Sequence, residues 1–235
     1  MKVRKVQLAS GIEISCQLSG DPGRPAMVLL HALGERAASW DEVAATFTTR
    51  FYVVALDLRG HGASSWPGNY SFELMRDDVI GVLDDLGLEN VIVVGHSMGG
   101  VVAYLMAQAQ PSRISGLVVE DVAPPFPRTR PVPERPAGAL PFDWPVVSAI
   151  VAEVNDPSMR WWKRLPQITA TTLIIGGGPT SHVPQAKLAE VARVVPACQF
   201  ITIPVGHHVH EAAPGAFAQT TLDWLGADDP DDGHE

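Results

Sequence analysis

Stretches that are almost entirely apolar alternate along this chain with stretches whose apolar residues recur every three or four positions. The first kind is short and rich in β-branched residues, which predicts buried strands at residues 27–30, 52–56, 91–94, 114–119, 171–175 and 199–203. The second kind predicts helices at residues 39–48, 71–87, 101–109, 185–194 and 214–225. Regular alternation of strands and helices predicts an α/β fold, in which a mostly parallel, twisted sheet is flanked by helices on both faces.

Three regions depart from this alternation. Residues 3–8 and 12–18 alternate loosely around a Ser-Gly pair and predict an opening β-hairpin. Eight prolines between residues 124 and 145 exclude a regular helix there, and two short helices are predicted at 144–154 and 157–165. We interpret residues 124–168 as a short cap inserted between two parts of a core, residues 1–123 and 169–226. The acidic residues 227–235 predict a disordered tail.

Composition narrows the range of partners. The 235 residues carry a net charge of −9, which argues against a nucleic-acid surface. The chain has no apolar run of the roughly 18 residues that a membrane helix needs, and its N-terminus does not resemble a signal peptide, so we expect a cytoplasmic protein without a membrane partner. Cys16 and Cys198 are expected to be buried free thiols. No zinc-like Cys/His spacing is present, so we expect no metal or cofactor; oligomeric state is not predicted.

The most informative motif is Gly95-His96-Ser97-Met98-Gly99, which fits G-x-S-x-G. A predicted strand precedes it and a predicted helix follows it, as the nucleophile turn of a hydrolase requires. The turn forces the serine into a strained backbone conformation, and the glycines on either side remove Cβ atoms that would clash. The hydroxyl is then exposed at a helix N-terminus, where backbone N–H groups can stabilise an oxyanion.

Three further motifs accompany the serine turn: His31-Ala32-Leu33-Gly34, Asp57-Leu58-Arg59-Gly60-His61-Gly62, and Gly206-His207 with Pro214 after it. With these motifs the chain resembles the α/β-hydrolase family from the first hairpin to Leu225. The resemblance implies that Ser97 is the nucleophile and His207 the base, with an oxyanion hole formed by the N–H groups of Leu33 and Met98. Ala32 departs from the pattern, because the family has glycine there.

Other polar residues have competing interpretations. Three histidines are alternatives to His207 as the base: His182, His208 and His210. Two histidines that flank the candidate site are expected to hold loops together: His31 and His96. A buried network of paired charges is expected to fix one turn and to consist of Asp57, Arg59 and His61.

The acid of the triad is the open question. The family usually places it in the loop after the next-to-last strand, but residues 176–184 contain no carboxylate and have Thr180 or Ser181 at that place. Some relatives place the acid after the strand that follows the nucleophile helix, where this chain has Glu120 and Asp121. Adjacent residues at a strand end point to opposite faces, so we expect one of them to reach His207. Alignment on the following Ala-Pro favours Glu120; Asp121, or no carboxylate partner at all, is the alternative.

These residues predict a serine hydrolase of carboxylesterase or lactonase type, which forms an acyl-enzyme at Ser97 on a small to medium apolar ester. The candidate pocket wall is Leu33, Met98, Phe126, Trp144, Trp161 and Trp162, although the tryptophans can equally form the core of the cap. Non-esterase members of the fold are alternatives: carbon–carbon hydrolases, lyases and cofactor-free haloperoxidases. A ligand-binding or sensor protein is another. Serine at the elbow argues against dehalogenases and epoxide hydrolases, whose nucleophile is a carboxylate.

Overall fold

The computed structural model describes residues 1–227, so the predicted acidic tail lies outside the described residues except for its first position. One eight-stranded sheet has the order β1-β2-β4-β3-β5-β6-β7-β8. The strands are β1 (Lys2–Gln7), β2 (Glu13–Ser19), β3 (Ala26–Leu30), β4 (Tyr52–Leu56), β5 (Val91–His96), β6 (Ile114–Glu120), β7 (Thr171–Gly176) and β8 (Cys198–Thr202). β1 and β2 form the predicted hairpin and β2 pairs antiparallel with β4, while all other pairs are parallel. The predicted mostly parallel α/β sheet is confirmed.

The central strands of the sheet consist almost entirely of apolar residues. Every residue of β3 and β5 is buried, because helices cover both faces of the parallel part of the sheet. The edge strand β1 exposes all its residues except Val6. Continuous apolar runs therefore mark the interior strands, and the mixed pattern of the first strand marks an edge.

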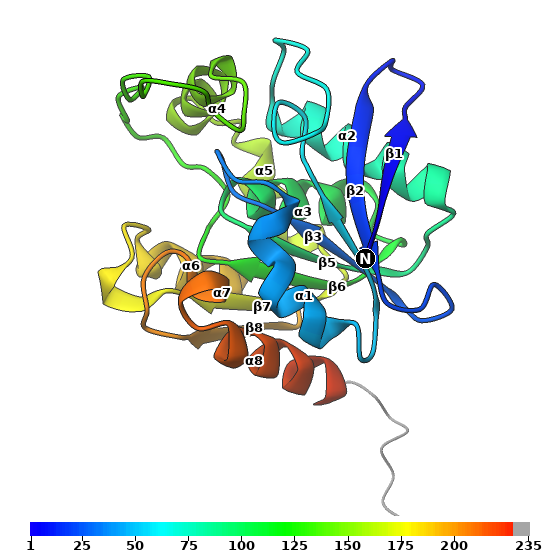
Figure 1. Cartoon of the computed structure of the whole chain (residues 1–235). Helices are drawn as coiled ribbons and strands as arrows, with labels where there is room; N and C mark the ends of the chain where they lie inside the picture. The colour runs from blue at the N-terminus through cyan, green and yellow to red at the C-terminus, as the bar shows by residue number, and fades with distance from the viewer. Residues whose placement is uncertain (228–235) are drawn as a thin grey trace, which may run out of the picture.

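Two helical layers enclose the sheet (Figure 1). Side chains of α2, α3 and α6 pack in one core cluster, and side chains of α1 and α8 pack in the other, on the opposite face. The long helices are α1 (Asp41–Phe47), α2 (Phe72–Leu86), α3 (Met98–Ala109), α4 (Pro145–Asn155), α6 (Gln185–Val194) and α8 (Pro214–Ala227). Short helical turns are η1 (Ala37–Trp40), α5 (Arg160–Lys163), η2 (Leu165–Gln167), η3 (Gly178–Thr180) and α7 (Val209–Ala212).

The helix signals of the sequence hold where capping residues are present. Ser71 is the N-cap of α2 and accepts a hydrogen bond from Leu74 N at 3.0 Å, and Gly87 ends the helix in the left-handed conformation. The helix expected over 157–165 is reduced to α5 and η2, since Pro166 offers no N–H to extend a helix. The sequence did not predict α7, whose four residues are too few for a periodic pattern.

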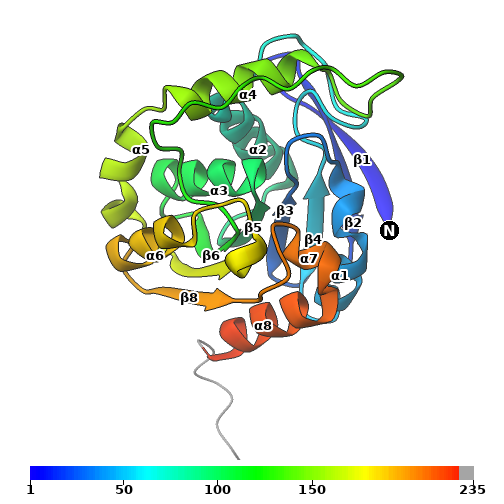
Figure 2. The ribbon, with the colours of Figure 1, turned by 90° about the vertical axis from the view of Figure 1, so that its left-hand side faces the viewer.

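Residues 124–144 are irregular and lead into α4, which lies beyond the carboxyl edge of the sheet (Figures 1 and 2). Backbone hydrogen bonds attach this region to the core, from Asp143 N to Gly60 O at 2.7 Å and from Gly62 N to Pro141 O at 2.9 Å. The proposed division into core and cap at residues 124 and 168 stays a prediction. Within residues 1–227, none of the helices combines the length and the apolar character needed to cross a bilayer.

Register aligns the carboxyl ends of the central strands. Leu30 of β3 pairs with Gly95 of β5, and His96 pairs with Glu120 of β6. The residues that follow these strands therefore meet at one edge, as expected for a parallel sheet. The candidate site is built there.

Candidate active site

Ser97 occupies a strained position between β5 and α3. Its φ is 50° and its ψ is −111°, a conformation that non-glycine residues rarely adopt. A Cβ atom at Gly95 would lie against the carbonyl oxygen of Gly99, and one at Gly99 would lie against that of Leu30. The two glycines therefore allow β5, α3 and β3 to pack closely enough to hold the serine in this conformation.

Two backbone N–H groups next to Ser97 are available to an anion. Within residues 1–227, the N–H groups of Leu33 and Met98 donate to no protein acceptor, and both residues line the pocket that contains Ser97. Met98 is the first residue of α3, where N–H groups have no intrahelical partner. In the neighbouring loop, the residue with a positive φ is Gly34, at 86°, and Ala32 does not have a positive φ. The methyl group of Ala32 therefore causes no backbone strain.

Two neutral histidines fix the loop that carries Leu33. Burial lowers the pKa of His31 to about 3 and that of His61 to about 4, so both rings are uncharged at neutral pH. Gly34 N donates to His61 Nε2 at 3.1 Å, and Leu58 N donates to His31 Nε2 at 2.9 Å. The expectation that His31 holds loops together agrees with these contacts.

His207 contacts the carboxylate of Asp121, the residue that directly follows β6. The distance from His207 Nδ1 to Asp121 Oδ2 is 2.7 Å, and the Asp121 side chain is fully buried. Asp121 has a φ of 46°, which turns the chain as it leaves β6. The predicted pairing of Glu120 with His207 is therefore wrong, and the alternative named with it has the required geometry.

Four hydrogen bonds surround the Asp121 carboxylate. Its Oδ1 accepts from Gly177 N at 2.7 Å and from Gln185 Nε2 at 2.9 Å, while its Oδ2 accepts from Ser181 Oγ as well as from His207. Burial alone would raise the pKa of Asp121, but these donors outweigh it and lower the pKa below its ordinary value. The ionised carboxylate can only accept, so His207 carries a proton on Nδ1 and its Nε2 is left to face a reactant. Ser181, one of the two residues that stand where the family usually has the acid, donates to Asp121 instead.

Glu120 contacts a different histidine. Its Oε1 accepts from the backbone N–H of His210 at 3.0 Å, and its Oε2 lies 2.7 Å from His210 Nδ1, with both side chains fully buried. The His210 ring stacks on Trp40 with centroids 3.9 Å apart. This second histidine–carboxylate pair is enclosed in the core, so it anchors α7 rather than meeting a substrate.

His96 connects the two pairs. Its Nε2 lies 3.0 Å from the carbonyl oxygen of His207, and its ring lies 4.7 Å from the ring of His207. Burial would lower the pKa of His96, but Glu120 and Glu35 outweigh it and raise the pKa to about 9. Ligand atoms of Glu35, His96 and His210 lie within 4.8 Å of one another, a group that could bind a cation. His96 Nδ1 lies 3.7 Å from Glu35 Oε2, and the contact of its Nε2 to His207 agrees with the expected loop-holding role.

These contacts bring His207 beside the serine turn, since His96 directly precedes Ser97. Within the described residues, Ser97 Oγ and His207 form no direct hydrogen bond. Catalytic hydrogen bonds are often long until a substrate is bound. Of the alternative bases, His182 lies against the His207 ring at 4.2 Å between centroids, and His208 is half exposed with its Nδ1 3.2 Å from Glu35.

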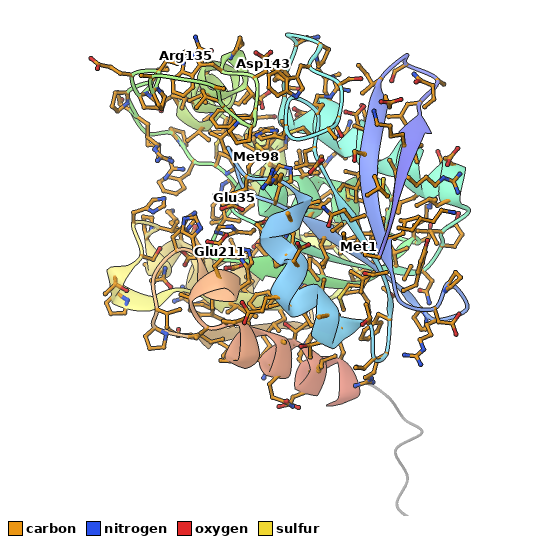
Figure 3. All side chains as sticks on the ribbon, viewed as in Figure 1. Met1, Glu35, Met98, Arg135, Asp143 and Glu211 are labelled. Atoms are coloured by element: carbon orange, nitrogen blue, oxygen red, sulfur yellow. The ribbon has the colours of Figure 1, made fainter. Side chains whose placement is uncertain are left out.

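A cavity of about 80 Å³ adjoins the serine. Ser97, Met98 and Leu33 line it together with two arginines, Arg128 and Arg130, and the rest of its lining is apolar, including Phe72 from α2, Val101 from α3 and Ile150 from α4. Figure 3 places Met98 and Glu35 below the cap, on which Arg135 and Asp143 are labelled. The sequence predicted neither arginine as a site residue, because only their meeting with the serine turn in space distinguishes them from other surface arginines.

None of the four predicted aromatic residues lines this cavity. Trp161 is buried against Phe72 and donates from Nε1 to Glu73 at 3.0 Å, and Trp162 donates to Pro125 O at 2.8 Å. Trp144 packs near Phe142, and Phe126 lies beneath the guanidinium of Arg128. The expectation that they form the pocket wall is wrong for this cavity. Trp144 and Trp162 contact residues of their own segment, as in the alternative of packing within the cap, whereas Trp161 packs against α2.

The turn after β4 contains the expected buried polar residues, but an acid from α2 pairs with its arginine. Arg59 pairs with Asp78 of α2 at 2.5 Å, both side chains being buried. Asp57 instead accepts from the backbone N–H groups of Ala37 and Ala63, at 2.8 and 2.9 Å. All three residues of the expected network, Asp57, Arg59 and His61, are buried and hydrogen-bonded at this turn, and His61 Nδ1 lies 3.1 Å from Arg59 O. The charge of Arg59, however, is paired with Asp78 from outside the expected network. Cys16 and Cys198 are free, with Cys16 buried and Cys198 partly exposed.

Comparisons with known proteins identify the family and the fold. The family model for the alpha/beta hydrolase fold matches residues 25–145. In an alignment 255 positions long, the chain is 26% identical to an sn-1-specific diacylglycerol lipase of Mus musculus, and the alignment covers 88% of this chain and 83% of that one. It is 36% identical over 113 residues to epoxide hydrolase 4 of Mus musculus, covering 47% of this chain and 32% of the relative's length. A solved hydrolase from Pseudomonas aeruginosa superposes with a TM-score of 0.82 at 26% identity, covering 95% of this chain and 98% of that one.

Proposed function

The chain belongs to the α/β-hydrolase family, and from this premise we propose that it is a serine hydrolase with the triad Ser97, His207 and Asp121. The substrate class is a carboxylic ester or lactone with a small acyl part. The observation that carries the proposal is the 2.7 Å contact between His207 Nδ1 and the buried Asp121 carboxylate at the edge of the sheet where the strained Ser97 also lies.

In the proposed reaction, Ser97 Oγ attacks the carbonyl carbon of the ester and His207 Nε2 takes the hydroxyl proton. Asp121 fixes the Nδ1–H tautomer of His207 and stabilises the imidazolium that forms. The tetrahedral intermediate collapses to an acyl-enzyme, and His207 returns the proton to the departing alcohol. Water then repeats the attack with His207 as base, which releases the carboxylic acid and regenerates Ser97.

The developing oxyanion is proposed to accept hydrogen bonds from Met98 N and Leu33 N. Their lack of protein acceptors supports this role, since donors that already point at the site need no rearrangement when charge develops. The N-terminus of α3 adds a favourable dipole at the same place.

The nucleophile separates this proposal from the chemistry named for one relative. Epoxide hydrolysis through a covalent intermediate uses a carboxylate nucleophile, and residue 97 is serine. The intact histidine–aspartate pair also favours an enzyme over a sensor protein with vestigial catalysis, because a receptor needs no oriented base.

Labelling with a fluorophosphonate probe tests the proposal. We expect rapid, stoichiometric labelling of the wild-type chain and none of Ser97→Ala, with the adduct on the peptide that contains residue 97. Slow labelling that Ser97→Ala retains would overturn the proposed function. A panel of esters with graded acyl chains, with Ser97→Ala as the control, then defines the preferred acyl length.

A further inference from the structure

Two arginines of the irregular segment after β6 line the cavity beside Ser97. Apart from Ser97, these are the polar side chains of a lining that is otherwise apolar and contains no carboxylate. The chain as a whole is acidic, with 26 Asp and Glu residues against 17 Lys and Arg residues. A pair of positive charges at this one cavity therefore runs against the overall charge of the protein.

Neither Arg128 nor Arg130 is balanced by an acid. Within residues 1–227, neither comes within 4.0 Å of a carboxylate oxygen, and Arg128 Nε is buried with no hydrogen-bond partner. Arg59, by contrast, is fully paired with Asp78. Arg128 is half-buried, and shielding part of a guanidinium from water without an anion is costly; burial and the charge of Arg130 lower its pKa. An anionic ligand would offset that cost.

Neighbouring side chains hold the backbone of Arg130 and the guanidinium of Arg128. The Asn155 side chain at the end of α4 accepts from Arg130 N at 2.7 Å and donates to Arg130 O at 2.8 Å. The Arg128 guanidinium lies 5.0 Å from the centroid of the Phe126 ring. The backbone of Arg130 and the guanidinium of Arg128 are thus positioned before any ligand binds, which favours recognition over a chance surface charge.

The arginine charges also act on His182, a neighbour of the proposed base. Burial lowers the pKa of His182, and the charges of His207, Arg130 and Arg128 lower it further. The His182 ring lies 4.2 Å from the ring of His207. Arg128 and Arg130 are therefore near enough to act on the charge of His182, which lies against the proposed base His207.

We infer, resting on the proposed function, that the cavity takes an ester whose acyl part carries a carboxylate, which Arg128 and Arg130 bind while Ser97 attacks the ester carbon. The planar fork of a guanidinium matches a carboxylate with two parallel hydrogen bonds. The apolar walls contact the methylene groups between the two ends of the acyl chain. The preferred substrate is a monoester of a short dicarboxylic acid, and a neutral ester of the same length leaves the arginines unpaired.

A matched pair of stable esters tests the inference: monomethyl glutarate and methyl pentanoate, both with five-carbon acyl chains. Proton release gives kcat/KM for each ester. For the wild-type enzyme we expect kcat/KM to be at least tenfold higher for monomethyl glutarate. In Arg128→Met and Arg130→Met the ratio of the two kcat/KM values should fall by about 10- to 100-fold, as expected for loss of a hydrogen bond between charged groups. Arg128→Lys should keep part of the preference.

Arg135→Met is the matched control, since Arg135 is an exposed arginine of the same segment that does not line this cavity. It should leave both rates and their ratio unchanged. A wild-type enzyme that prefers methyl pentanoate, or arginine variants with an unchanged ratio, would overturn the inference while the proposed function stands. If Arg128→Met does not fold, Arg130→Met, at an exposed position, decides the outcome alone. Failure of the proposed function is seen separately, as ester hydrolysis that survives Ser97→Ala.

Discussion

Replacing Asp121 with asparagine should abolish most activity without moving the backbone, and the hydrogen bonds around the side chain explain why. Asp121 Oδ1 accepts from Gly177 N, a group that can only donate, and from Gln185 Nε2. The oxygen of an asparagine must therefore stay on that side, which turns its NH₂ group toward His207. The NH₂ group donates, so His207 Nδ1 must become the acceptor and the ring proton moves to Nε2.

A proton on Nε2 prevents His207 from accepting the proton of Ser97. The same change of tautomer in a well-studied serine protease lowers kcat by about 10⁴-fold, and we expect a similar loss here, corresponding to about 5 kcal/mol of transition-state stabilisation. KM should change little, because Asp121 does not line the cavity. Steady-state hydrolysis of a short-chain ester, with circular dichroism to verify folding, provides the measurement.

Glu120→Gln is the matched control, one residue away and equally buried. Glu120 contacts His210 and not His207, so after correction for the folded fraction kcat should fall less than tenfold. The reasoning is refuted if Asp121→Asn retains kcat within tenfold of the wild type, or if Glu120→Gln loses more activity than Asp121→Asn.

Three further predictions concern the supporting structure. Burial raises the pKa of Glu153 to about 7 although Phe72 N donates to it, so the free energy of unfolding falls as pH rises from the unfolded-state pKa near 4.5 through 7. In urea titrations Glu153→Gln should be more stable than the wild type by about 1–2 kcal/mol at pH 8 and equally stable at pH 4. Equal gains at both pH values would contradict this. Gly99→Ala should lower the melting temperature and remove activity, because its Cβ meets Leu30 O; a variant with wild-type melting would contradict the packing described. Ala32→Gly should cost about 0.4–1 kcal/mol of stability with kcat within threefold, and a rise in kcat would indicate that the methyl group restricts the oxyanion loop.

The sequence predicted the fold because local signals agreed with one another. Continuous apolar runs marked the interior strands, and Ser71 and Gly87 marked both ends of α2. The same consistency identified the serine turn, where the glycines needed for close packing are adjacent in sequence. These features depend on neighbouring residues, so a single chain suffices to find them.

The acid was harder to predict because its identity depends on backbone torsion and tertiary contacts. Glu120 and Asp121 each contact a histidine, and His207 and His210 are three residues apart, so sequence pattern allows either pairing. The left-handed φ of Asp121 decides which carboxylate meets His207, and no residue type at that position signals it. The arginines escaped prediction for a related reason, since they lie in a proline-rich segment without periodicity and meet Ser97 only through the tertiary fold.

The central claim is that a hydroxyl on residue 97 attacks the substrate with assistance from the His207–Asp121 pair. Rapid acid quenching of a reaction with a slowly deacylating ester, followed by peptide mass spectrometry, measures this directly. The account predicts an added acyl group on the peptide containing Ser97, formed within the first turnover and far more slowly in Asp121→Asn. A turning-over enzyme that carries the acyl group on another residue, or on none, would contradict it.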